Sequence, residues 1–113
     1  MAISFDAIGE KYVTFLAAET AKEGEVCKIS ADAAVDVCAQ GEQFCGVITQ
    51  VRNGTASVLM GGYTELPYSG SAPEVGYGKL SANGEGGVQV DENGRTYLIV
   101  RVDGANGTVG LFL

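Results

Sequence analysis

A short phrase occurs twice in the chain, and this repeat constrains the fold more than any other feature of the sequence. Residues 51–60 are VRNGTASVLM, and residues 104–113 are GANGTVGLFL. Each copy has Asn-Gly-Thr, two further residues and then three apolar ones, and the copies stand 53 positions apart in a chain of 113 residues. A repeat on this scale favours a fold built from two similar halves.

The similarity extends well beyond this phrase. KISAD at 28–32 matches KLSAN at 79–83 with an offset of 51, and then 35–60 matches 88–113 with an offset of 53. Identical pairs in the longer match are Val35/Val88, Val37/Val90, Gly41/Gly94, Val47/Val100, Asn53/Asn106, Gly54/Gly107 and Thr55/Thr108. We interpret this as a duplication, so Val47 should superpose on Val100, and Asn53 on Asn106.

Most of the chain has the pattern of short β-strands. Segments rich in β-branched and aromatic residues are bounded by Gly, Asp or Asn, as strands commonly are. The predicted strands are 11–18, 25–30, 34–39, 44–51, 55–66, 87–91, 96–103 and 108–113, with a further strand ending in KLSAN. The segment 15–23, FLAAETAKE, also holds good helix formers, so a short helix there is the alternative.

Glycine marks the predicted turns, because 17 glycines stand against only two prolines. Asn53-Gly54 suits a two-residue type I′ hairpin turn, in which both residues have positive φ. Its counterpart, Asn106-Gly107, should lie in a longer turn that begins at Asp103-Gly104. The residues to which we assign a structural role in turns are Gly41, Asn53, Gly54, Gly94, Asn106 and Gly107.

These patterns predict an all-β protein, a small barrel or sandwich built from two duplicated β-meander units. One meander cannot bury its apolar face alone, whereas two can close on each other. We expect a single domain over 1–113, divided into an N-terminal arm at 1–11, a first unit at 25–62, an exposed connecting loop at 65–78 that holds both prolines, and a second unit at 76–113.

Charge and composition narrow the function classes. Fourteen acidic against seven basic residues give a net charge of −7, which disfavours nucleic acid and an anionic membrane as partners. The N-terminal residues lack the basic and apolar regions of a signal peptide, and three cysteines cannot all pair within one chain. We therefore expect synthesis in a reducing cytoplasm.

Catalytic chemistry has little support in the sequence. The chain has no histidine, which removes the usual general base and most zinc sites, so we expect no catalytic residues, no metal, no cofactor and no enzymatic activity. Cys27 and Cys45 are interpreted as buried core thiols, and Cys38 as an exposed thiol. DENGR at 91–95 resembles part of a calcium loop but is interpreted as a turn, and NGEGG at 83–87 as a hairpin tip.

The run VCKISADAAVDVCAQGEQFCGVITQVRNGTASVLMGGYTELP, at 26–67, resembles the core of phage head decoration proteins, the lambda-type cement proteins and the related small capsid-stabilising family. The similar features are two short strands, then Cys45-Gly46-Val47-Ile48, then an apolar strand that ends at Gly61-Gly62-Tyr63. The resemblance implies a virion protein on the capsid exterior, bound to the major capsid protein as a homotrimer, that stabilises contacts between capsid subunits.

Members of this family often use an N-terminal arm that becomes ordered on the capsid. Residues 1–11 suit that role, since Ile3, Phe5 and Ile8 are apolar residues in a segment without a clear strand pattern. The arm could equally cover the open end of the barrel. Two other classes stay open: a phage fibre or tail-tip module, and a small ligand-binding β-barrel or minor enzyme subunit, which would need a cavity with convergent polar groups.

Overall fold

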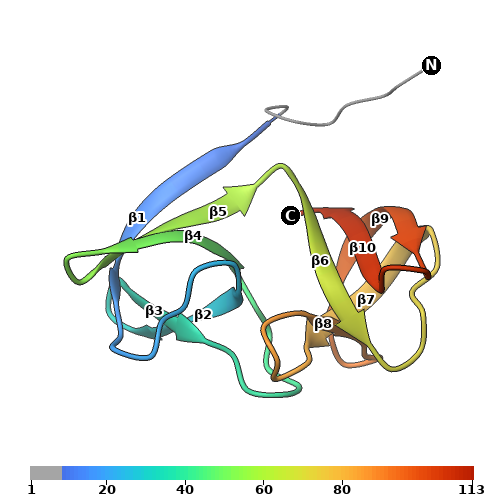
Figure 1. Ribbon diagram of the computed structural model, residues 1–113, viewed down its shortest axis with the longest axis horizontal. Helices are drawn as coiled ribbons and strands as arrows, with labels where there is room; N and C mark the ends of the chain where they lie inside the picture. The colour runs from blue at the N-terminus through green and yellow to red at the C-terminus, as the bar shows by residue number, and fades with distance from the viewer. Residues whose placement is uncertain (1–8) are drawn as a thin grey trace.

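The computed structural model describes residues 9–113, and within them the chain forms strands and no helix. Figure 1 shows the first five strands gathered on one side of the molecule and the last five on the other. The strands are β1 Lys11–Ala17, β2 Val26–Ala31, β3 Ala34–Val37, β4 Gly46–Arg52, β5 Thr55–Gly61, β6 Tyr63–Ser69, β7 Gly76–Ala82, β8 Val88–Val90, β9 Arg95–Asp103 and β10 Thr108–Phe112.

Each half of the chain closes into its own five-stranded barrel. The strand order is β1-β3-β2-β4-β5 in the first barrel and β10-β6-β8-β7-β9 in the second. When β6 is matched to β1, the two orders are the same, and the one parallel contact in each barrel, β1 with β3 and β6 with β8, also matches. The predicted all-β class and the two-unit construction are confirmed, with five strands in each unit.

Strand register defines which residues of the two barrels correspond. In the first barrel Ile48 pairs with Val58, and in the second Ile99 pairs with Leu111. Immediately after each of these pairs one residue is skipped in the ladder, Thr49 in β4 and Val100 in β9. The predicted match of Val47 to Val100 is therefore wrong, because Val100 occupies the bulge position and corresponds to Thr49.

The hairpin turns explain why the sequence match drifts by two residues. Asn53 and Gly54 have φ of 52° and 77°, as predicted for a tight two-residue turn. The second turn is longer, also as predicted, and the Asp103 carboxylate accepts hydrogen bonds from the backbone N–H of Ala105 at 3.1 Å and Asn106 at 3.2 Å. Asn106 therefore follows Asn53 in sequence position but not in backbone conformation, since its φ is not positive.

The end of each turn nevertheless occupies the same place in its barrel. The carbonyl oxygen of Gly54 accepts a hydrogen bond from the N–H of Ala17 at 2.9 Å, and that of Gly107 accepts one from Tyr68 at 3.0 Å. Ala17 and Tyr68 also pair with corresponding residues of β3 and β8, Val35 and Val88. The duplication thus includes β1 and β6, which the sequence match did not reach.

The predicted connecting loop at 65–78 is wrong. Its first part belongs to β6, which pairs with β10 through Pro67 and with β8 at Tyr68, so the connection before β7 is only 70–75. The chain passes from the first barrel to the second at Gly62, whose φ is 101°. This bend divides the predicted strand 55–66 into β5 and β6. The alternative helix at 15–23 is absent, since β1 runs to Ala17 and turns follow.

The other two predicted turn glycines act in different ways. Gly41 has a φ of 84°, which a residue with a side chain adopts only at a cost. Gly94 closes a turn in which its N–H donates to the carbonyl of Asp91 at 2.9 Å. Its φ is not positive, but a Cβ at this position would overlap the backbone carbonyl of Leu80. Gly94 is therefore needed for close approach of two backbones.

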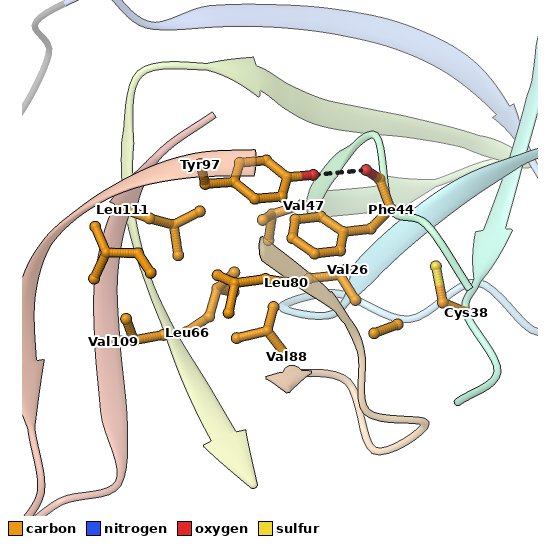
Figure 2. Packing of buried hydrophobic residues seen from close by; sticks show 12 residues of the cluster. Val26, Cys38, Phe44, Val47, Leu66, Leu80, Val88, Tyr97, Val109 and Leu111 are labelled. Atoms are coloured by element: carbon orange, nitrogen blue, oxygen red, sulfur yellow. Dashed lines mark hydrogen bonds between the residues drawn. The ribbon is translucent and has the colours of Figure 1, made fainter. Parts of the chain in front are cut away.

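Two clusters of buried side chains fill the molecule. The smaller one lies inside the first barrel and consists of Cys27, Val35, Ile48, Ala56 and Val58. The larger one fills the second barrel and also includes Val26, Cys38, Phe44 and Val47 from the first half (Figure 2). The second core therefore extends into the contact between the barrels.

The barrels are joined by stacking and by hydrogen bonds. The rings of Phe44 and Tyr97 stack with centroids 4.9 Å apart and planes 4° from parallel, and the Tyr97 hydroxyl donates to the Phe44 carbonyl at 3.1 Å (Figure 2). Ala82 donates to the carbonyl of Glu42 and accepts from the N–H of Gly41, both at 2.9 Å. The segment before β4 thus lies against the second barrel as an additional pairing partner.

Candidate interaction surfaces

The predicted capsid-contact residues, Ile3, Phe5 and Ile8, lie outside the described residues 9–113. The predicted arm at 1–11 ends where β1 begins, at Lys11. β1 is the first strand that follows the predicted arm in the chain.

β1 exposes large apolar side chains to solvent. Tyr12 is 54% exposed and Leu16 is 57% exposed, and Val13 between them is 41% exposed. Phe15 and Ala17, by contrast, pack against the first core. The N-terminal half of the strand therefore presents apolar groups on both of its faces, which is unusual for a strand with one face on a core.

One edge of β1 has few strand partners among the described residues. Along one side the strand pairs with β5 from Lys11 to Leu16, whereas along the other it pairs with β3 only at Leu16 and Ala17. The N–H of Leu16 donates to Ala33 on that second side at 2.8 Å, and the N–H of Ala17 donates toward β5. By alternation, the backbone groups of Tyr12 and Thr14 face the second side, where an added strand could pair with them.

A second apolar surface lies on the other barrel, and sequence reasoning missed it. Val75, Tyr77 and Val90 are 68%, 80% and 47% exposed. They line a hollow of about 290 Å³ together with the core residues Leu80 and Ile99. The only signal in the sequence is a pair of large apolar residues inside the glycine-rich segment EVGYG.

The hollows bear on the alternative of a small ligand-binding barrel. The hollow beside Tyr77 has Glu74 and Lys79 among its lining residues, and its volume is near the lower end for ligand pockets. A smaller hollow of about 180 Å³ on the first barrel has a polar lining of Thr14, Gln50, Arg52, Thr55 and Ser57. Neither encloses a nucleophile with an adjacent base.

An ion pair holds the segment at 39–42, which lies between β3 and β4 and contacts the second barrel. The Lys28 ammonium lies 2.8 Å from the Glu42 carboxylate, which also accepts a hydrogen bond from the N–H of Ala39 at 2.6 Å. Both interactions lower the pKa of Glu42, and the one with Lys28 has the larger effect. The pairing with Glu42 in turn raises the pKa of Lys28. Because the side chains of the pair are 34% and 37% exposed, solvent weakens their attraction, and the main effect of the pair is to hold the backbone at 39–42 in place.

The motifs DENGR at 91–95 and NGEGG at 83–87 both form tight connections between strands, as predicted. The Asp91 carboxylate accepts hydrogen bonds from the N–H of Asn93 at 2.9 Å and the hydroxyl of Ser81 at 2.8 Å, and these lower its pKa. In the loop at 83–87 the side-chain oxygen of Asn83 accepts from the N–H of Glu85 and of Gly87. No group of three or more His, Cys, Asp or Glu side chains within 9–113 is arranged to hold a metal ion.

The cysteines are placed differently from the prediction in one case. Cys27 is fully buried in the first core, as predicted, and Cys45 is half-buried against it. Cys38, predicted to be exposed, is 8% exposed and packs in the larger core beside Val26 and Phe44. Burial raises the pKa of its thiol to about 11. All three are free thiols.

Comparison with known proteins does not place the chain in a family. No protein-family model matches it, and neither does any curated protein. Across the part of the chain that the structure describes, no helix is both long and apolar enough to cross a membrane.

Proposed function

We propose that this protein is a structural component of a phage virion, which binds the outer surface of the capsid and stabilises contacts between major capsid subunits. The observation that carries the proposal is the exposed apolar β1, with Tyr12 and Leu16 on its outer face and one edge that is incompletely paired within residues 9–113. It directly follows the N-terminal region that contains Ile3, Phe5 and Ile8. Together they form one continuous stretch suited to contact another protein.

The resemblance of 26–67 to phage head decoration proteins supports the same proposal. That run comprises β2 to β5 and most of β6, so it covers the barrel to which β1 belongs. The net charge of −7 is suited to an abundant protein that stays soluble before it docks.

The proposal includes a homotrimer on the shell. Three like contacts meet at each local three-fold axis of an icosahedral lattice, so three copies can occupy three equivalent places at once. Simultaneous attachment raises the avidity well above that of a single weak contact. In this proposal the protein is located on the capsid exterior of the finished virion.

The first test is binding of the purified protein to expanded, undecorated heads assembled from a phage major capsid protein. We expect saturable co-sedimentation of purified protein and a gain in the heat resistance of the heads. Failure of both would overturn the proposal. A chain without residues 1–8 should bind more weakly, and equal binding would remove the arm from the mechanism while leaving the rest.

Matched point variants test the role of β1. Tyr12→Ser should reduce affinity for the heads by about tenfold, since losing a buried aromatic contact costs at least 1.4 kcal/mol when it lies at the centre of an interface. Tyr77→Ser removes a tyrosine that is still more exposed, on the other barrel, and should leave affinity unchanged. If Tyr77→Ser reduced the affinity and Tyr12→Ser did not, the contact surface would instead lie on the second barrel.

A further inference from the structure

Cys27 and Cys45 lie side by side where β2 meets β4. The N–H of Cys45 donates to the carbonyl of Cys27 at 2.8 Å, while Gly46 is the register partner of the same Cys27. Two consecutive residues therefore oppose one, which is the arrangement of a β-bulge. A bulge alters the direction of its first side chain, and here Cys45 packs against the cluster that contains Cys27.

The pKa values of the two thiols are shifted in opposite directions. The Cys27 thiol donates to the carbonyl of Gly46 at 3.6 Å, next to Cys45. Interaction with this thiol and, to a smaller degree, the charge of Arg95 outweigh burial and lower the pKa of Cys45 to about 7. The same contact and full burial raise the pKa of Cys27. Arg95 is held nearby, with its guanidinium 5.1 Å from the centre of the Tyr97 ring. Cys45 is half-buried and so retains contact with solvent, whereas Cys27 has none.

We propose that Cys45 and Cys27 form a reversible dithiol–disulfide pair, in which Cys45 attacks a small-molecule disulfide and Cys27 resolves the product. The Cys45 thiolate forms a bond to one sulfur of the small disulfide, whose S–S bond breaks and releases one thiolate that takes up a proton. Cys27 then loses its proton and attacks the Cys45 sulfur, which releases the second small thiol. Two protein thiols are oxidised and one small disulfide is reduced to two thiols.

The position of this pair gives the modification a structural effect. Val26 and Phe44, the neighbours of the two cysteines in the chain, both belong to the core that the barrels share. A bond between Cys27 and Cys45 would link β2 to the beginning of β4 beside that contact. Oxidation would then stabilise the first barrel at the place where it meets the second.

The test is incubation of the folded protein with oxidised glutathione, followed by intact mass and peptide mapping. We expect loss of two hydrogen atoms and a peptide linked through Cys27 and Cys45, in wild type and in Cys38→Ser alike. A glutathione adduct that persists on Cys45, a bond to Cys38, or no reaction would each overturn the proposal. Cys45→Ser should show neither adduct nor link.

A second measurement uses the reduced wild-type protein and does not depend on any variant folding. The rate of alkylation of Cys45 by iodoacetamide should reach half its maximum near pH 7. Arg95→Gln should move this midpoint to higher pH, because it removes the nearby positive charge. A midpoint at or above about pH 8.5, the value of an ordinary thiol, would contradict the role of Cys45 as the attacking group.

Discussion

Asn53 and Gly54 illustrate how far single residues determine this fold. Both adopt positive φ in a two-residue turn, and the dipeptide is one of the few that do so at low cost. At Asn106 the same dipeptide lies in a longer turn, where the Asp103 carboxylate binds the backbone and only Gly107 has positive φ. The identity of a residue therefore predicts that a turn occurs, and loop length decides its conformation.

Gly54→Val tests the conformation of the first turn. A β-branched residue at a φ of 77° is strained, so we expect a loss of about 1–2 kcal/mol in the free energy of unfolding. The matched control is Gly104→Val in the second turn, where φ is not positive and the nearest atom to an added Cβ is the Tyr68 hydroxyl at 4.0 Å. Equal effects in urea denaturation would contradict the assigned turn.

Tyr97→Phe tests the contact between the barrels. The change keeps the ring stacked on Phe44 and removes only the hydroxyl that donates to the Phe44 carbonyl. We expect a loss of about 1 kcal/mol in unfolding free energy, the usual value for one hydrogen bond. Tyr77→Phe, on an 80% exposed side chain, should change it by less than about 0.5 kcal/mol. If both variants unfold like wild type, this hydrogen bond does not contribute to joining the barrels.

At the scale of strands and loops, the sequence predicted most elements but not their pairing. Strands β1 to β5 and β8 to β10 fall on predicted segments, because period-two alternation and flanking glycines are local signals. The later part of β6 falls in the predicted loop at 65–78, because Pro67 and the glycines after it are typical of a loop. The offset between β4 and β9 was wrong because a two-residue difference in loop length and the bulges at Thr49 and Val100 have no marker in the sequence.

The candidate interaction surfaces are harder to predict from the sequence than the strands are. Tyr12 and Leu16 lie in a segment whose composition predicts an ordinary strand. The pairing that leaves part of one of its edges without a strand partner among residues 9–113 is seen only in three dimensions. The sequence predicts an exposed thiol at Cys38. It is buried because the second barrel covers it, a contact between residues far apart in the chain.

The loop between β7 and β8 depends on one side chain, and Asn83→Ala tests this. Its side-chain oxygen accepts hydrogen bonds from Glu85 at 2.7 Å and Gly87 at 3.1 Å, and Gly86 in the same loop binds Val26 of the first barrel. We expect a loss of about 1–3 kcal/mol in thermal or chemical unfolding. Asn93→Ala, in an exposed turn, should cost less than about 0.5 kcal/mol. A small effect at Asn83 would contradict its role as an organiser of the loop.

The carboxylates of the turns predict lower stability in acid. Hydrogen bonds lower the pKa values of Asp91 and Asp103 in the folded protein, and the pairing with Lys28 lowers that of Glu42. A group with a lowered folded pKa contributes stability above its unfolded pKa, about 4, and this contribution is lost as pH falls through the folded value. The melting temperature should therefore fall between about pH 5 and pH 2.

Asp91→Asn should reduce the size of this fall, since the variant has one fewer carboxylate that binds protons more weakly when folded. Glu92→Gln, one position away, is the control for loss of a single negative charge. Melting temperatures of the two variants, measured across the same pH range, check the prediction. A wild-type protein whose melting temperature is constant down to pH 2 would contradict it.

The whole molecule is a duplicated unit in which each copy closes its own barrel and one core extends across the contact between them. Sequence repetition accounts for the matching strand orders, and the differences between copies account for the distinct surfaces. β1 has an exposed apolar face, whereas its counterpart β6 has a buried leucine, Leu66, and Pro67, which cannot donate to an added strand. The two copies of the unit therefore differ in the face that this strand exposes.

The measurement that tests the proposed function most directly is an image reconstruction of expanded heads saturated with this protein. We predict added density on the outer surface at the three-fold and quasi-three-fold positions, in three equal lobes, each accounting for one chain of 11.6 kDa, with β1 facing the shell. A bare shell, or density confined to another symmetry position, would contradict the proposed role.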